Sequence, residues 1–351
     1  MATVTATDTI PTSLVGSYPQ PDWLIDRESL GKRLPPRLRA RELWRIDPKW
    51  LRDAQDDAVL LAIRDQEQAG LDILTDGEMR RESYSNVFAN ALSGVDLDNP
   101  GTIRSRAGTD TFVPRVTGPV RRREQVHVAD VEFLRAHTNR PIKVTVPGPF
   151  TMSQQAVNDF YESDEEMAFA YADAVREEIQ DLFAAGADIV QLDEPWLESR
   201  PEQAKRFAVP TLDRAIDGVG GTTALHVCFG YPAFVPDRPP AYHFLTELAA
   251  TSLDQVSIET AQPDLDLAVL EALPGKTIIL GVIALDSAEV ETPEAVAGRL
   301  RRALPYKRPS ELVAAPDCGM KYLPRKAAYA KLEALVAGAR AVLEQAAGVS
   351  R

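Results

Sequence analysis

The chain has 351 residues, of which 44% are hydrophobic, so it is long enough for one large core or two ordinary ones. Its 39 Lys and Arg against 52 Asp and Glu give a formal net charge of −13, which argues against general binding to nucleic acid or to an anionic membrane surface. No run approaches the roughly 18 apolar residues of a membrane span, and the first residues lack the pattern of a signal peptide. We therefore expect a cytoplasmic protein that acts on small molecules, with neither nucleic acid nor membrane as a partner.

Amphipathic stretches alternate with short apolar runs from about residue 50 onward, a pattern typical of repeated βα units around a parallel sheet. The first predicted helix ends at Gly70. A second begins at the capping box formed by Ser163 and Glu166 and ends at Gly186. A third begins at residues 292–293, with Thr as the N-cap and Pro in the first turn.

The chain contains eight strand-like runs, and most of them end in Gly, Pro or a polar residue. They cover residues 13–19, 73–78, 142–149, 189–195, 224–230, 255–260, 278–284 and 312–319. This pattern predicts an α/β fold of the (β/α)8 TIM barrel type, because such a barrel gathers the C-terminal ends of its strands at one mouth. An open doubly wound sheet is the alternative, but no G-x-G-x-x-G loop follows the first run. We expect residues 1–351 to form a single catalytic barrel domain whose first 12 residues are flexible.

Two segments do not fit the repeat. Residues 20–50 predict an irregular N-terminal arm, rich in Arg between 32 and 45, which is either a solvated wrap over the barrel or an anion-binding or subunit-contact region. Residues 97–140 contain no convincing helix and alternate weakly, which predicts a β-hairpin insertion.

Both cysteines of the chain follow strand-like runs, and cytoplasmic thiols serve metal binding or catalysis more often than disulfides. His226 and Cys228 stand two residues apart, so the alternation of a strand places both side chains on one face. Glu259 and Cys318 end two other runs. An imidazole, two thiolates and a carboxylate at one barrel mouth predict a tetrahedral zinc site, with bonds of about 2.0 to 2.3 Å. Ordinary packing of these side chains is one alternative, and a structural zinc in a non-catalytic barrel is another.

Six short motifs follow one another in a fixed order. They are Val15-Gly-Ser-Tyr-Pro19, Asp76-Gly-Glu78, Gln191-Leu-Asp-Glu-Pro195, His226-Val-Cys228, Ile258-Glu-Thr260 and Pro316-Asp-Cys-Gly319. Over about residues 13 to 340, this ordered set resembles the catalytic barrel of cobalamin-independent methionine synthase, in its short single-barrel branch. The resemblance implies a zinc-dependent thiol S-methyltransferase that makes methionine from homocysteine, with a zinc-bound thiolate as the nucleophile. It also implies that the zinc ligands are His226, Cys228, Glu259 and Cys318.

The same resemblance assigns homocysteine binding to Val15, Gly16, Ser17, Glu78 and Asp193. The two carboxylates suit the ammonium of the substrate, whereas backbone N–H groups and the Ser17 hydroxyl suit its carboxylate. A free thiol of pKa about 8.5 is mostly protonated at neutral pH, and coordination to zinc deprotonates it while its sulfur remains nucleophilic. Helix capping or salt bridging is the alternative role for the two carboxylates.

Two departures from the family bear on the methyl donor. The tryptophan loop that stacks on the folate pterin in the long enzymes is not visible, since the corresponding run continues through residues 146–151 as Val-Pro-Gly-Pro-Phe-Thr. The proton-donating His of the family falls on Asp286, which we expect to serve as a proton relay. A carboxylate with an ordinary pKa of about 4 is a poor proton source at neutral pH. Methylcobalamin, a corrinoid protein and methyltetrahydrofolate all remain candidate donors, with a slight preference for a corrinoid, because its Co(I) leaving group needs no proton.

A second family shares part of the pattern. Residues 15–24 and the His226-x-Cys-Phe-Gly230 run also resemble epoxyalkane:coenzyme M transferase, which uses a similar zinc site to open an epoxide with a thiol. Alkylation of another small thiol is therefore the alternative function. Residues 321–325, Lys-Tyr-Leu-Pro-Arg, are closer to the short methionine synthases. The Pro-rich residues 230–240 predict a loop placed to cover the active site.

Overall fold

The computed structural model describes residues 9–32, 38–83, 85–106, 108–231, 241–263 and 265–349, with side chains described as far as Val342. Its helices are α1 (Arg27–Gly31), α2 (Leu51–Ala69), α3 (Ser85–Ala89), α4 (Val128–His137), α5 (Pro149–Gln154), α6 (Asp164–Ala184), α7 (Pro201–Ile216), α8 (Leu245–Leu248), α9 (Pro293–Ala303) and α10 (Arg325–Val349), with short 3₁₀ turns at Arg41–Leu43, Pro48–Trp50, Leu267–Ala272 and Pro309–Glu311. Its strands are β1 (Leu92–Arg104), β2 (Asp110–Arg122), β3 (Lys143–Pro147), β4 (Val157–Asn158), β5 (Ile189–Asp193), β6 (Thr222–Val227), β7 (Gln255–Glu259), β8 (Thr277–Ile283) and β9 (Leu312–Pro316).

A parallel sheet of six strands in the order β3-β5-β6-β7-β8-β9 forms most of the barrel wall. The first two predicted runs complete the wall through isolated parallel bridges, which pair Thr12 with Ala314, Ser13 with Ile73 and Leu74 with Ile142. Backbone hydrogen bonds follow the same path, because Ser13 N–H donates to the Ala314 carbonyl at 3.0 Å and Ile73 N–H to the Thr12 carbonyl at 3.0 Å. Eight strand segments therefore surround one axis, and the predicted TIM barrel is confirmed.

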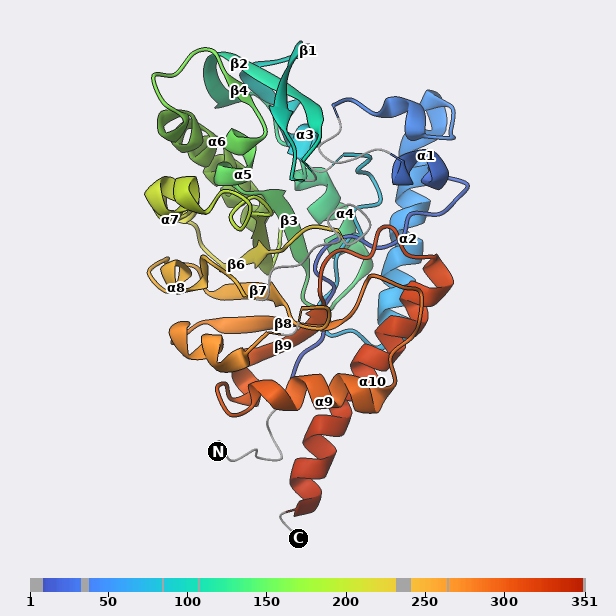
Figure 1. The fold of residues 1–351 in the computed structure, drawn as a ribbon. Coiled ribbons are helices and arrows are strands. Elements are labelled where there is room, and N and C mark those ends of the chain that lie inside the picture. The colour runs from blue at the N-terminus through green and yellow to red at the C-terminus, as the bar shows by residue number, and fades with distance from the viewer. Residues whose placement is uncertain are drawn as a thin grey trace.

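Helices cover the outside of this wall, with α6 and α7 on one side and α2 and α10 on the other (Figure 1). The predicted helix ends are confirmed. The Ser163 hydroxyl accepts the Glu166 N–H at 3.1 Å, and Gly70 adopts φ 93° after α2. Thr292 caps α9 in the same way, accepting the Ala295 N–H at 3.2 Å.

Two apolar layers fill the protein. A large cluster packs the helices onto the outside of the strands. A smaller one lies inside the barrel, contributed by different strand segments: Val15, Ile73, Ile189, Ala224, Ile279, Val313 and Ala315. Because this inner layer closes the lower part of the barrel, the polar strand ends above it form the floor of a cavity.

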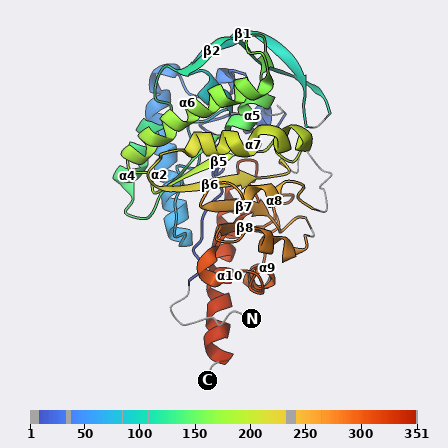
Figure 2. The same cartoon turned by 90° about the vertical axis from the view of Figure 1, so that its left-hand side faces the viewer.

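The insertion differs from its predicted bounds of 97–140. Its antiparallel strands β1 and β2 span residues 92–122 and arch over the top of the barrel beside α6, as Figure 2 shows. The remainder forms α4, whose Val131 and Leu134 are buried. The sequence gives only a weak indication of this helix, because the helix is short and lacks a typical N-cap residue. His127 stands at that position, and its side chain makes no capping hydrogen bond.

The N-terminal arm packs as a small unit of its own. Ile25, Leu30, Ala40 and Leu43 form a separate apolar cluster beside the barrel. From the Arg-rich part, Arg39 forms a salt bridge with Asp98 of the hairpin.

Several predicted features lie outside the described residues. Of the N-terminal segment expected to be flexible, residues 1–8 are not described. Residues 33–37 of the arm and 232–240 of the expected covering loop lie outside them as well. None of the helices in the described ranges has the length and apolar character needed to cross a membrane.

Candidate active site

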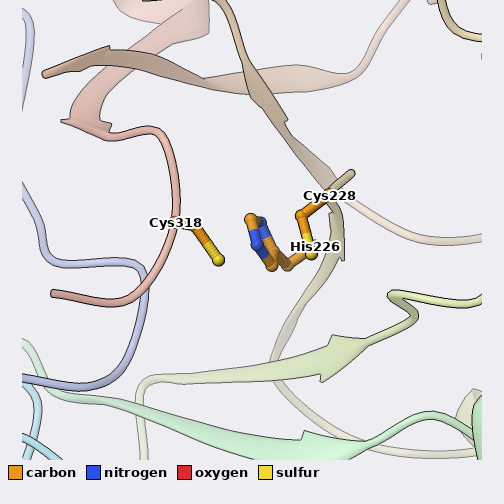
Figure 3. Close-up of side chains that lie close together, drawn as sticks. All are labelled: His226, Cys228 and Cys318. Atoms are coloured by element: carbon orange, nitrogen blue, oxygen red, sulfur yellow. The ribbon is translucent and has the colours of Figure 1, made fainter. Parts of the chain in front are cut away.

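Three candidate metal ligands converge at the barrel mouth (Figure 3). His226 lies in β6, Cys228 follows the end of that strand, and Cys318 follows β9. All three are buried, and one ligand atom from each lies within 4.8 Å of the other two. A tetrahedral zinc ion with bonds of about 2.0 to 2.3 Å holds its ligand atoms roughly 3.3 to 3.8 Å apart, so a small contraction brings these atoms to zinc geometry.

The imidazole of His226 is oriented by β7. Its Nδ1 lies 2.9 Å from the hydroxyl oxygen of Ser257, the residue opposite it in the sheet. Its Nε2 is buried and has no hydrogen-bond partner of regular geometry among the described residues. An unsatisfied buried nitrogen is costly, and a metal ion at Nε2 would satisfy it.

The two thiols influence each other. A hydrogen bond from Cys318 lowers the pKa of Cys228 well below its ordinary value, although burial raises it, and nearby His226 lowers it further. The same hydrogen bond and burial raise the pKa of Cys318 well above its usual range. The pair alone thus favours one thiolate. Two thiolates at this place require an additional cation, which is the chemistry of a zinc-ligand set.

Glu259, the fourth predicted ligand, stands beside this group but does not belong to it. It ends β7, is fully buried, and its Oε1 accepts the Phe229 N–H at 3.1 Å. Its charge is close enough to contribute to the raised pKa of Cys318. The structure therefore brings three of the four predicted ligands together and places the fourth carboxylate next to them.

A cavity of about 70 Å³ opens at this group. Glu78 and Asp193 line it together with the three candidate ligands. Gly230 and Tyr231, which begin the loop expected to cover the site, also line the cavity. The sequence analysis gave no site role to the remaining lining residues, which are Arg106, Gln155, Pro195, Lys321 and Tyr322. Arg106 reaches the cavity from the connection of the hairpin, where its guanidinium donates to the Pro195 carbonyl at 2.8 Å. No sequence pattern marks it, because its position depends on how the insertion folds over the mouth.

Glu78 and Asp193 place two like charges on one cavity. Glu78 has φ 56°, an unusual conformation for a residue with a side chain, and its Oε1 accepts the Thr145 hydroxyl at 2.9 Å. Asp193 ends β5 and accepts the Gln191 amide at 2.7 Å. Burial raises the pKa of Asp193 to about 7, His226 lowers it, and the charge of Glu78 raises it. Such a pair suits a cationic group such as an ammonium.

The other predicted substrate residues lie deeper or further away. Val15 belongs to the inner apolar layer. Gly16 and Ser17 are buried next to this site, and a Cβ on Gly16 would stand only 2.7 Å from the Glu78 carboxylate, so a larger residue there would displace that carboxylate. Asp286 is exposed in the segment after β8 and is not among the residues that line the cavity.

Comparison with known proteins gives consistent matches along nearly the whole chain. Residues 10–341 match the family model of the cobalamin-independent synthase catalytic domain. A methionine synthase of Sulfolobus acidocaldarius is 32% identical over 337 residues, covering 96% of this chain and 93% of the relative. A methionine synthase of Saccharolobus solfataricus is 32% identical over 343 residues, covering 96% of both.

Solved structures agree. A B12-independent methionine synthase from Shewanella sp. W3-18-1, in complex with selenomethionine, superposes with a TM-score of 0.89 at 34% identity, covering 97% of this chain and 99% of that one. A protein from Listeria monocytogenes described as a vitamin-B12-independent methionine synthase has a TM-score of 0.72 at 20% identity, covering 96% and 99%, and shows the shared fold.

Proposed function

Because the chain belongs to the cobalamin-independent methionine synthase family of methyltransferases, we propose that it is a zinc-dependent enzyme that methylates the thiol of homocysteine to give methionine. The observation that carries this proposal is that one cavity contains both a candidate thiol-binding group and a candidate ammonium-binding group. The imidazole and two thiols of His226, Cys228 and Cys318 meet there, and the carboxylates of Glu78 and Asp193 line the same space. A thiol amino acid needs a thiol-binding centre and an ammonium-binding centre in the same cavity.

His226, Cys228 and Cys318 would hold the zinc, and Glu259 would complete the set by exchanging its contact with the Phe229 N–H. The bound ion would supply Lewis acidity that lowers the pKa of the substrate thiol and keeps its sulfur nucleophilic. Both cysteines must be reduced for this role, so a cytoplasmic location is part of the proposal.

The chain's own residues position the amino acid. Glu78 and Asp193, which line the cavity, bind its ammonium, and the backbone of Gly16 and the hydroxyl of Ser17 receive its carboxylate. The Shewanella relative was solved with selenomethionine, an analogue of the product. We propose that the corresponding cavity of this chain binds methionine. Asp286, which is exposed in the segment after β8, remains a predicted proton relay.

The methyl donor is proposed to be a methylcorrinoid or methyltetrahydrofolate. The test is to incubate zinc-loaded protein with homocysteine and, separately, methylcobalamin, methyltetrahydrofolate and its polyglutamate, and to measure methionine by mass spectrometry. We expect methionine from at least one donor and none from a Cys228→Ser variant. Absence of methionine with every donor refutes the proposal, and a thioether formed from coenzyme M and an epoxyalkane in a parallel sample would identify the alternative thiol alkylation.

A further inference from the structure

We propose that Lys143 is a positioning residue whose ammonium, buried inside the barrel beneath the cavity, is the counter-charge for Asp193 and thereby supports binding of the amino-acid ammonium. This inference rests on the proposed function, because it concerns how the homocysteine cavity holds its charge. Lys143 is only 1% exposed, and within the described residues its Nζ makes no hydrogen bond.

The other buried lysines show how unusual this is. Each of them donates to an oxygen: Lys276 to the Leu253 carbonyl, Lys307 to the Leu273 carbonyl, Lys321 to the Arg81 carbonyl, and Lys331 to the Glu291 carboxylate. A buried ammonium without such a partner costs free energy, since its desolvation is not repaid by hydrogen bonds. Among the buried lysines of the described residues, Lys143 is therefore the exception. We infer that it has a role other than packing.

The strand register places Lys143 under the cavity. It is the first residue of β3 and lies opposite Ile189, a member of the inner apolar layer. Thr145, two residues further along, faces the same side and donates its hydroxyl to Glu78 at 2.9 Å. Lys143 thus stands one layer below the residues that line the cavity.

Gln191, on the neighbouring strand, connects the layer of Thr145 with Asp193. Gln191 lies opposite Thr145 in the sheet, and its amide donates to Asp193 at 2.7 Å. Its Oε1 is buried and has no hydrogen-bond partner among the described residues. Polar groups of β3 and β5 therefore form a column from Lys143 up to Asp193.

Electrostatics connects the two ends of this column. Burial lowers the pKa of Lys143 to about 7, and the negative charge of Asp193 opposes this shift. Around the cavity, Asp193 and Glu78 share space with thiols that carry negative charge when they bind a metal. A cation below them offsets part of this repulsion, and the low dielectric of the barrel interior strengthens the effect.

The test compares two ligands that differ only in the ammonium. Zinc-loaded wild type and Lys143→Met are titrated by calorimetry with L-methionine and with 4-(methylthio)butanoate, which lacks the amino group. We expect Lys143→Met to bind methionine about tenfold more weakly, with little change for the des-amino analogue. Lys307→Met, which removes a buried lysine that does not line the cavity, is the matched control and should bind both ligands as the wild type does.

A double-mutant cycle separates a positioning role from a structural one. If Lys143 acts through Asp193, the variant carrying Lys143→Met and Asp193→Asn binds methionine no more weakly than Asp193→Asn alone. Thermal unfolding and zinc content are measured on each variant, and we expect Lys143→Met to unfold at or above the wild-type temperature, because it removes an unpaired buried charge. Lys143→Gln provides a second variant if the methionine side chain perturbs folding.

The outcomes distinguish this inference from the proposed function. A wild-type protein that binds methionine no better than the des-amino analogue refutes the amino-acid assignment and the role of Lys143 with it. A wild type that discriminates, together with Lys143 variants that discriminate equally well or with additive losses in the cycle, refutes the role of Lys143 alone.

Discussion

His226 and Ser257 are joined by a hydrogen bond of 2.9 Å between the imidazole Nδ1 and the serine hydroxyl, which leaves Nε2 as the ring nitrogen for an ion. Ser257→Ala removes this support, so the ring loses its fixed orientation. We expect the zinc dissociation constant, measured by competition with a chelator, to rise about tenfold. This is the lower end of the range of effects for residues that orient a metal ligand. Ser13→Ala deletes another buried hydroxyl, one bonded to the Leu14 carbonyl, and should leave zinc affinity unchanged. Equal affinities in wild type and Ser257→Ala would contradict the prediction.

Removing one thiol tests the ligand set directly. Cys318→Ser replaces a soft sulfur ligand by a hydroxyl, and we expect the purified variant to contain far less than one zinc per chain by elemental analysis. Substituted with Co(II), it should also lose part of the sulfur-to-metal charge-transfer absorption. Met320→Leu, a volume-conserving change at a buried residue two positions away, is the control for disturbance of the same segment. Full zinc occupancy in Cys318→Ser would remove Cys318 from the ligand set.

The backbone conformation of Glu78 predicts that two substitutions of this residue weaken homocysteine binding alike but differ in their effect on protein stability. Its φ of 56° strains any residue with a Cβ but not glycine. Glu78→Ala and Glu78→Gly both remove the carboxylate, so both should bind homocysteine much more weakly than wild type. The Gly variant should nevertheless be more stable than the Ala variant, by about 1 kcal/mol in urea unfolding. Equal stabilities would show that the positive φ relaxes in the absence of the side chain.

The sequence predicted the barrel because its periodic signals are local. Helix stops such as Gly70 and caps such as Thr292 are set by neighbouring residues, and the structure reproduces them. The runs at 13–19 and 73–78 predicted full strands, yet they pair only through bridges. In the second run, Gly77 and Glu78 adopt positive φ, a backbone conformation that does not continue a strand.

From the sequence, the site could be predicted only for residue types that commonly bind metals or substrates and that stand at strand ends. His226, Cys228 and Cys318 stand at strand ends, and the barrel brings them together. Arg106 was missed because its place in the cavity wall depends on the fold of the inserted hairpin. Lys143 did have a signal, because it is the single charged residue of its strand, but sequence alone does not reveal that its Nζ lacks a hydrogen-bond partner among the described residues.

The segment after β8 is held by a buried ion pair, which predicts a change of stability in acid. Glu291 accepts the Lys331 ammonium at 2.9 Å and the Ala284 N–H at 2.7 Å. Burial raises the pKa of Glu291, but the hydrogen bonds from Lys331, Ala284 and its own N–H, together with the charge of Lys331, hold the pKa below its ordinary value. Because the folded-state pKa is depressed, the carboxylate contributes stability above the ordinary pKa of about 4.5 and loses it as the pH falls through the folded value.

Glu291→Gln should therefore lower the free energy of unfolding by about 2 kcal/mol at pH 7, because Lys331 loses its charged partner. The difference from wild type should shrink as the pH falls from about 5 towards 3, since the wild-type carboxylate then becomes protonated as well. Urea unfolding across this range measures both effects. Glu289→Gln, an exposed change in the same segment, should stay within about 0.5 kcal/mol of wild type throughout. A Glu291→Gln deficit that stays constant down to pH 3 would mean that packing of the segment, rather than the ionised carboxylate, provides the stability.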